Sequence, residues 1–348
     1  MRQTNIFSLP QGALTFPLKI QGAKTMLNHR RHILLASLAV TASLLLTPAS
    51  QASDYPERPI ELIVPFAAGG GTDALARAFS VAAQKHLPKG VIVMNRAGAS
   101  GSIGWQYMMN AKPDGYTLAV ATVEIVILPH LNLLNATYQD VTPIAQLNAD
   151  PAAIVVRSDS PYNTVEEFIE AARKQPGKMT MGTAGNGGIY DLAAAAFEDK
   201  TGTKFNRIPF QGAAPSILSL LGNNLDAVTA SPAEVSVHVS AGKLKILAVM
   251  ADNRLADFKS TPTLKERNID LSIGTWRGIM GPKGLPADVV KTLKAIVPVI
   301  AKEPEMQNAL KKMNLGYVYS DDVGFKAIMA RDNQVFKELV TKLKITVN

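Results

Sequence analysis

The segment from Ile60 to Asp73 constrains the fold more than any other part of the sequence. An apolar run rich in β-branched residues ends at a proline, three glycines follow at Gly69–Gly71, and Thr72 and Asp73 open a helical pattern. Glycine lets a ligand approach the main chain closely, and Thr72 or Asp73 can cap a helix whose free N–H groups favour an anion. The pattern predicts an anion cradle made of backbone, although strand-to-helix turns that bind nothing also carry glycines.

Residues 1–52 have the features of an export signal, with Met26 as the expected start. Two arginines precede the apolar run Ile33–Leu46, and Ser50-Gln51-Ala52 offers small residues for cleavage before Ser53. The apolar run is shorter than the roughly 20 residues of a comfortable membrane span. We therefore expect a mature protein that is exported to the periplasm and soluble.

Net charge and cysteine content limit the ligands and the kinds of site that this protein can have. The formal net charge is +8, and removal of the five basic residues of the leader leaves +3. Such a balance suits small anionic ligands and lacks the basic stripe of a nucleic-acid-binding protein. The chain has no cysteine, which excludes disulfides, thiolate zinc sites and a cysteine nucleophile. It also excludes a lipid anchor, which would need a cysteine at the processed N-terminus.

After residue 55, short apolar strands alternate with amphipathic helices in two series that meet near residue 150. This alternation predicts two α/β domains built on parallel sheets. We assign residues 53–145 and 275–348 to domain 1 and residues 146–274 to domain 2, joined by crossing strands at Thr142–Leu147 and around Trp276. The glycine-rich turns all follow strands, so a crevice between the two sheets would bring them together.

Signatures of catalysis are weak. Ser100 lies in Gly98-Ala99-Ser100-Gly101-Ser102, which resembles a nucleophile elbow but lacks the closing glycine in frame. An exported α/β hydrolase that uses Ser100 or Ser102 is the competing class. None of the five histidines has a second ligand at metal spacing, and Gly69–Gly71 has neither P-loop nor dinucleotide spacing. We expect no catalytic residue, no metal and no cofactor.

Two tryptophans and three arginines have two interpretations each. Trp105 is typical of a core anchor, whereas Trp276, on a crossing segment, is equally compatible with stacking on a ligand. Three arginines could each bind a carboxylate through two hydrogen bonds, although each is more typical of a surface or structural arginine: Arg96, Arg254 and Arg277.

Seven motifs occur in a fixed order between Tyr55 and the end of the chain. They are Pro65–Asp73, Asn95–Gly101, Pro113–Leu118, Gly182–Gly187, Pro209–Pro215, Pro262–Glu266, and Trp276-Arg277-Gly278 followed by Gly281-Pro282. Together they resemble the substrate-binding proteins of tripartite tricarboxylate transporters, also called the Bug family. Seven motifs in order are far more specific than any one of them.

The resemblance implies a type II periplasmic binding protein fold, in which two domains close on a small organic carboxylate without catalysis. It implies delivery to the two membrane subunits of a secondary transporter or, in some relatives, presentation to a sensor kinase, and we expect a monomer. The ligand-binding residues that the resemblance implies lie in three loops: Ala68, Gly69, Gly70, Thr72 and Asp73 on one wall, Thr183, Gly185, Gly187 and Gly188 on the other, and Gly212 and Ala213 close by.

Three positions depart from the family pattern. Gly188 stands where a serine is usual, Asp191 stands where a histidine is usual, and Glu124 replaces a small polar residue at the end of a strand. If Glu124 faces the ligand, it disfavours a plain dicarboxylate and favours a ligand that also carries an ammonium group or another hydrogen-bond donor. The alternative is that both acids point to solvent or cap helices, which suits Asp191 in a first helical turn.

Overall fold

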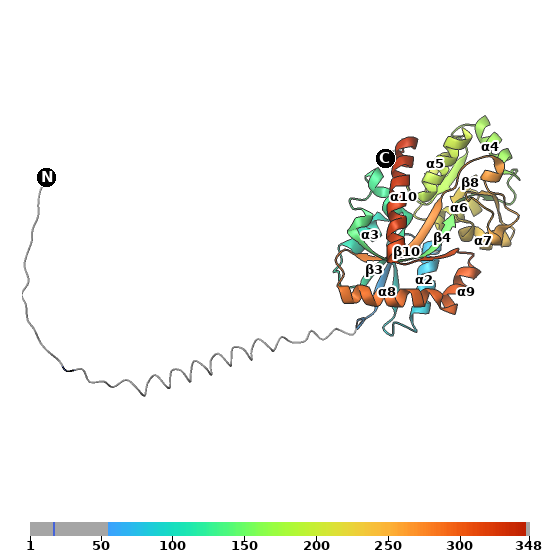
Figure 1. Cartoon of the computed structure of the whole chain (residues 1–348). Coiled ribbons are helices and arrows are strands. Elements are labelled where there is room, and N and C mark those ends of the chain that lie inside the picture. The colour runs from blue at the N-terminus through green and yellow to red at the C-terminus, as the bar shows by residue number, and fades with distance from the viewer. Residues whose placement is uncertain (1–16, 18–54, 346–348) are drawn as a thin grey trace, which may run out of the picture. The chain divides into compact units, whose positions relative to one another are not determined.

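The computed structural model describes Pro17 and residues 55–345 of the 348-residue chain (Figure 1). Apart from Pro17, the predicted export signal lies outside the described residues. Within residues 55–345, no helix combines the length and the apolar character needed to cross a membrane.

Sheet A has six strands in the order β11-β4-β10-β3-β1-β2. Its strands are β1 (Ile60–Val64), β2 (Val91–Asn95), β3 (Thr117–Thr122), β4 (Val141–Pro151), β10 (Gly274–Pro282) and β11 (Tyr317–Ser320). Strand β1 pairs in parallel with β2 and β3. Strand β10 pairs antiparallel with β3 and β4, and β11 pairs antiparallel with β4.

Sheet B has five strands in the order β7-β6-β8-β5-β9. Its strands are β5 (Ala153–Arg157), β6 (Thr180–Thr183), β7 (Asn206–Pro209), β8 (Ala227–Ala230) and β9 (Leu244–Val249). Strand β6 is parallel to β7 and β8, whereas β5 is antiparallel to β8 and β9.

Both sheets are therefore mixed, and the prediction of parallel sheets is wrong for the strands at the crossing. The chain leaves sheet A through β4, enters sheet B at β5, and returns to sheet A through β10. The outgoing and returning segments run in opposite directions and pair with each other, with Trp276 opposite Ala149 and Arg277 opposite Asn148. The predicted crossing segments, Thr142–Leu147 and the Trp276 segment, are these two strands.

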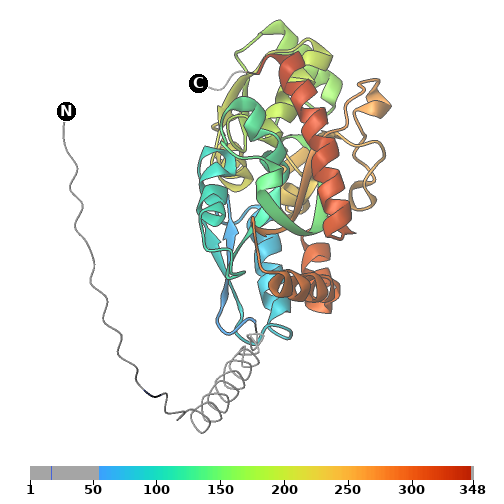
Figure 2. The ribbon, with the colours of Figure 1, turned by 60° about the vertical axis from the view of Figure 1, so that its left-hand side comes forward.

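Nine α-helices surround the sheets within the described residues (Figure 1). They are α2 (Gly71–Ala83), α3 (Ser102–Met109), α4 (Val165–Lys174), α5 (Ile189–Thr201), α6 (Ala213–Leu221), α7 (Pro232–Ser240), α8 (Ala287–Lys302), α9 (Pro304–Lys312) and α10 (Asp322–Leu343). Helix α10 contacts β4 of sheet A and also α5 beside sheet B (Figure 2). Lys342 of α10 forms an ion pair with Asp199 of α5 at 2.9 Å, so this helix connects the two halves of the molecule.

Helix α2 follows β1 as the glycine-rich turn predicts, but it begins earlier than expected. Its buried side includes Leu75, Phe79 and Ala82 at helical spacing. The N-cap residue is Gly70, which has no side chain with which to cap the helix. The prediction that Thr72 or Asp73 caps it is wrong, because the helix begins at Gly71 and both residues lie inside its first turn.

Helix α4 shows the opposite case, because the spacing of Thr164 and Glu167 in the sequence predicts a capping box at its start. The Thr164 hydroxyl accepts a hydrogen bond from the N–H of Glu167 at 3.2 Å, and the Glu167 carboxylate accepts from the N–H of Thr164 at 3.4 Å. This reciprocal arrangement is the predicted capping box, and it is confirmed.

Candidate functional site

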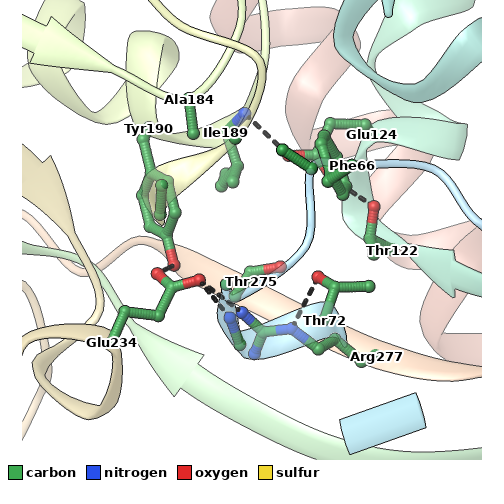
Figure 3. A pocket seen from close by; sticks show the side chains of 15 residues that line it. Phe66, Thr72, Thr122, Glu124, Ala184, Ile189, Tyr190, Glu234, Thr275 and Arg277 are labelled. Carbon is green, nitrogen blue, oxygen red and sulfur yellow. Dashed lines mark hydrogen bonds and ion pairs between the residues drawn. The ribbon is translucent and has the colours of Figure 1, made fainter. Parts of the chain in front are cut away.

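Loops from the two sheets face each other around a small inner cavity (Figure 3). Its volume is about 20 Å³, which is room for about one water molecule. Loop residues next to sheet A and helix starts next to sheet B both contribute to its wall. The lining residues are Phe66, Ala67, Gly70, Gly71, Thr72, Thr122, Glu124, Ala184, Ile189, Tyr190, Gly212, Ala213, Glu234, Thr275 and Arg277.

A larger outer cavity, of about 300 Å³, adjoins the inner one. The two share Phe66, Ala184 and Gly212. The outer cavity is lined mainly by the small-residue turns that follow strands, and none of its lining residues is acidic or basic. They are Phe66, Gly98, Ala99, Ser100, Gly101, Leu133, Ala184, Gly185, Asn186, Pro209, Phe210, Gln211 and Gly212.

The anion cradle at the start of α2 already holds a carboxylate of the chain itself. The N–H of Gly71, the first of the helix, donates to Oε1 of Glu234 at 3.0 Å. Glu234 lies in the first turn of α7, where it forms a capping box with Ser231. A side chain from beside sheet B therefore reaches across to a helix beside sheet A, and the backbone donor at Gly71 is shown to suit a carboxylate.

Arg277 links this carboxylate to the crossing strands. Its side chain is 2% exposed, and it donates to Asp150 at 2.7 Å, to Glu234 at 3.3 Å and to the hydroxyl of Thr72 at 3.0 Å. Burial alone would lower the pKa of Arg277, but the carboxylates of Glu234 and Asp150 outweigh burial and raise that pKa above its ordinary value. The guanidinium is thus a permanently charged, buried group with two carboxylate partners.

Tyr190 completes the set around Glu234. Its hydroxyl donates to Oε2 of Glu234 at 2.7 Å (Figure 3). Burial raises the pKa of the Tyr190 phenol well above 10, and the nearby charge of Glu234 adds to the effect. The phenol therefore remains a hydrogen-bond donor at physiological pH.

The start of α5 holds a second carboxylate from across the cleft. Helix α5 has Gly188 as its N-cap, and the N–H of Ile189 donates to Oε1 of Glu124 at 3.2 Å. The hydroxyl of Thr122 donates to the other oxygen of Glu124. Burial raises the pKa of Glu124, and these hydrogen bonds offset that effect only in part.

Asp73 and Asp191 fix the two loops from within. Asp73 accepts hydrogen bonds from the N–H of Gly69 and from Arg77, each at 2.9 Å. Asp191 accepts from the N–H of Gly187 at 3.0 Å and from Arg207 at 2.8 Å. Both carboxylates are thus held by an N–H of their own loop and by an arginine of α2 or β7, and neither residue lines the inner or the outer cavity.

The structure places the predicted ligand-binding residues in three groups. Gly70, Thr72, Glu124, Gly212 and Ala213 line the inner cavity, and Gly185 and Gly212 line the outer one. The remaining six lie in the same loops but line neither cavity: Ala68, Gly69, Asp73, Thr183, Gly187 and Gly188. Whether any of them contacts ligand stays a prediction.

The aromatic and nucleophile candidates have structural roles. Trp276 packs edge-on against Phe325 and donates to Asp332 at 2.8 Å, on the side of α10. Trp105 is fully buried. The hydroxyl of Ser100 donates to the main-chain carbonyl of Asn186 at 2.6 Å, a contact that supplies no base for a nucleophile.

The other arginine candidates lie outside the inner cavity. Arg254 is paired with Glu266 at the surface at 2.9 Å, and Arg96 lies over the ring of Tyr107 at 3.6 Å. Arg277 lines the inner cavity, whereas Arg96 and Arg254 line neither the inner nor the outer one.

Sequence reasoning missed Glu234, Tyr190 and Asp150. Glu234 had a local signal, because Ser231-Pro232-Ala233-Glu234 has the spacing of a capping box with proline at the first helical position. That signal predicts helix α7, which was also missed. It does not reveal that the same carboxylate reaches Gly71 and Arg277, since those contacts span 163 and 43 residues.

Comparisons with known proteins agree with this architecture. The UPF0065 protein in the gbd 5′ region of Cupriavidus necator is 32% identical over 90% of this chain and 98% of its own length. The crystal structure of a TctC solute binding protein from Polaromonas, without ligand, is 53% identical, covers 83% of this chain and 99% of its own, and has a TM-score of 0.63. The periplasmic binding protein BugD is 29% identical, covers 84% and 99%, and has a TM-score of 0.81.

Two structures from Rhodopseudomonas palustris, each 23% identical, share the fold. MatC holds malate, has a TM-score of 0.78 and covers 82% of this chain and 100% of its own. The second protein holds adipate, has a TM-score of 0.80 and covers 84% of this chain and 99% of its own. The predicted periplasmic binding protein fold is thus confirmed. Residues 75–345 match the family described as tripartite tricarboxylate transporter family receptor, TctC. This protein belongs to that family, which consists of substrate receptors and not of enzymes.

Proposed function

We propose that this protein is a soluble, monomeric periplasmic receptor that captures a small organic carboxylate in the cleft between its two sheets. It delivers that ligand to the membrane subunits of a tripartite tricarboxylate-type secondary transporter. The observation that carries the proposal is the outer cavity, whose volume of about 300 Å³ lies at the lower end of the range for small-molecule sites.

The chemistry of the outer cavity suits a carboxylate. Its wall contains no acidic side chain, and Gly212, which lines it, is the N-cap of α6. Gly212 has no side chain, so a carboxylate in the outer cavity can approach the main chain at the start of α6. The malate and adipate held by the two Rhodopseudomonas palustris proteins support the same ligand class.

A thermal-shift screen of mono-, di- and tricarboxylates tests ligand capture. A ligand at 100 times its Kd should stabilise the folded protein by about 2.7 kcal/mol. Ala184→Phe places a ring where both cavities meet and should abolish the shift, whereas Ala241→Phe, at an exposed position, should leave it unchanged. Absence of stabilisation by every carboxylate would contradict the proposal, as would ester hydrolysis that disappears in Ser100→Ala.

Delivery to a transporter needs a test in cells. Deletion of the gene should abolish uptake of the radiolabelled ligand found in the screen, and the wild-type gene should restore uptake. If uptake persists while ligand-dependent transcription is lost, the protein presents its ligand to a sensor kinase and the transport part of the proposal is wrong.

A further inference from the structure

The inner and outer cavities differ in charge, and this difference bears on the ligand of the proposed function. Two carboxyl groups, those of Glu124 and Glu234, and one guanidinium, that of Arg277, line the inner cavity. A third acid, Asp150, already binds Arg277 at 2.7 Å. Glu234 and Asp150 therefore share Arg277, whereas Glu124 forms no ion pair within residues 55–345. An added ammonium group would supply Glu124 with a cation and favour its ionised form, and an added carboxylate would not.

Four of the donors that line the inner cavity already bind its two glutamates. The N–H of Gly71 and the hydroxyl of Tyr190 both bind Glu234. The N–H of Ile189 and the hydroxyl of Thr122 both bind Glu124. Each oxygen of Glu124 accepts one of these hydrogen bonds and can accept another. The inner cavity thus offers acceptors to a ligand.

The volume of the inner cavity also suits a small hydrogen-bond donor such as an ammonium group. About 20 Å³ accommodates one water-sized group. An ammonium group has this size, whereas a carboxylate adds a carbon and a second oxygen. The neighbouring outer cavity, of about 300 Å³ against about 20 Å³, is fifteenfold larger and has no acidic side chain in its wall.

We propose that the ligand is an amino acid or a closely related ammonium-bearing carboxylate, and that Glu234 and Glu124 determine this specificity. Its ammonium group enters the inner cavity and donates to these two carboxyl groups. Its carboxylate lies in the outer cavity beside Gly212, and its carbon skeleton passes the shared residues Phe66 and Ala184. This inference rests on the proposed function, because it assumes that the cleft binds a carboxylate.

Calorimetry with matched pairs of acids tests the inference. The pairs are succinate and aspartate, glutarate and glutamate, and propionate and alanine. Any other plain acid that stabilises the protein in the screen is compared with its own 2-amino derivative. We expect the amino acid to bind at least about tenfold more tightly than its plain partner in the wild-type protein.

Glu234→Gln should reduce that preference at least about tenfold, because it removes the charge while glutamine can keep the capping box with Ser231. Glu167→Gln is the matched control, since Glu167 forms the same capping box with Thr164 at an exposed site. It should leave the preference unchanged. If Glu234→Gln does not fold, as judged by circular dichroism, Glu124→Gln takes its place with the same expected loss.

The results separate the two proposals. Plain acids that bind as tightly as their amino derivatives overturn the ammonium assignment and leave the carboxylate receptor intact. A preference that persists in both glutamine variants overturns the roles of Glu234 and Glu124. If no plain acid and no amino acid binds, the proposed function itself is wrong.

Discussion

The start of α2 and the start of α5 have the same arrangement of residues but differ in the charged groups nearby. Each helix has a glycine N-cap, Gly70 or Gly188, with no side-chain cap. In each, an aspartate in the first turn accepts from the N–H of the residue before the cap. In each, the first N–H of the helix donates to a glutamate from across the cleft, Glu234 for α2 and Glu124 for α5.

The surroundings give these equivalent groups different titration behaviour. Burial would raise the pKa of Asp73, but hydrogen bonds from Arg77, the N–H of Gly69 and Asn95 lower it below 3.8. Burial raises the pKa of Asp191, and its bonds to Arg207 and Gly187 offset this only in part. Glu234 contacts Arg277, whereas Glu124 has Thr122 and Ile189 as its hydrogen-bond partners. The same local motif therefore occurs in two places, and the neighbouring charges and hydrogen bonds set a different protonation in each.

The largest expected effect comes from removing the buried cation near the start of α2, which α5 lacks. Arg277→Met leaves Asp150 and Glu234 buried without their cation, so the free energy of unfolding should fall by about 3–5 kcal/mol. Urea denaturation of the purified protein measures the change. Arg254→Met removes an exposed ion pair with Glu266 and should cost less than about 1 kcal/mol. Equal losses in the two variants would contradict a special role for Arg277.

A second test asks whether the close contacts around Gly71 explain why the start of α2 needs a glycine there. A Cβ atom on Gly71 would lie 2.8 Å from Nη2 of Arg277 and 3.0 Å from Oε1 of Glu234. Gly71→Ala should therefore lower the free energy of unfolding by about 1–3 kcal/mol. Gly70 has φ of −83°, and a Cβ there would meet its nearest atoms at 3.9 Å. Gly70→Ala should change stability by less than about 0.5 kcal/mol.

Thermal unfolding and denaturant titration of both alanine variants give the comparison. A Gly70→Ala protein as destabilised as Gly71→Ala would mean that the loop is sensitive as a whole. In that case the close approach of Arg277 and Glu234 to Gly71 would not explain the requirement for glycine.

The smallest expected effect concerns pH at the start of α5. Because burial raises the pKa of Glu124 above 4.5, the folded protein keeps this proton at pH values where the unfolded chain has lost it. Its contribution to stability is therefore present below 4.5 and is lost as pH rises through the folded value. Glu124→Gln should remove this loss, so the variant should gain stability relative to wild type as pH rises.

Unfolding free energies of both proteins between pH 4 and 8 measure the gain, and the exposed Glu170→Gln variant is the control. The other buried acids titrate in both proteins, so the difference between them isolates Glu124. A constant difference across this range would show that Glu124 titrates alike in the folded and unfolded chain.

The sequence alone determined the class of fold and the positions of the helices at the end of the chain. The residue pattern at the end of the chain predicts helices near Val289–Ala301, Pro304–Lys312 and Val323–Lys344, and the helices lie at Ala287–Lys302, Pro304–Lys312 and Asp322–Leu343. Helical periodicity, prolines and capping residues are local in sequence, so they can be recognised without the tertiary structure. The order of the seven motifs identified the family for the same reason.

Tertiary structure decided the direction of the crossing strands and the charge inside the cleft. The pairing of β4 with β10 joins Asn148 to Arg277, residues 129 positions apart, and no local pattern encodes strand direction across such a separation. Glu234 shows the same limit, because its capping box is local but its contact with Gly71 is not. The sequence alone predicts the backbone cradle at the start of α2. Tertiary packing decided which carboxylate binds there, because it places Glu234 of α7 next to Gly71.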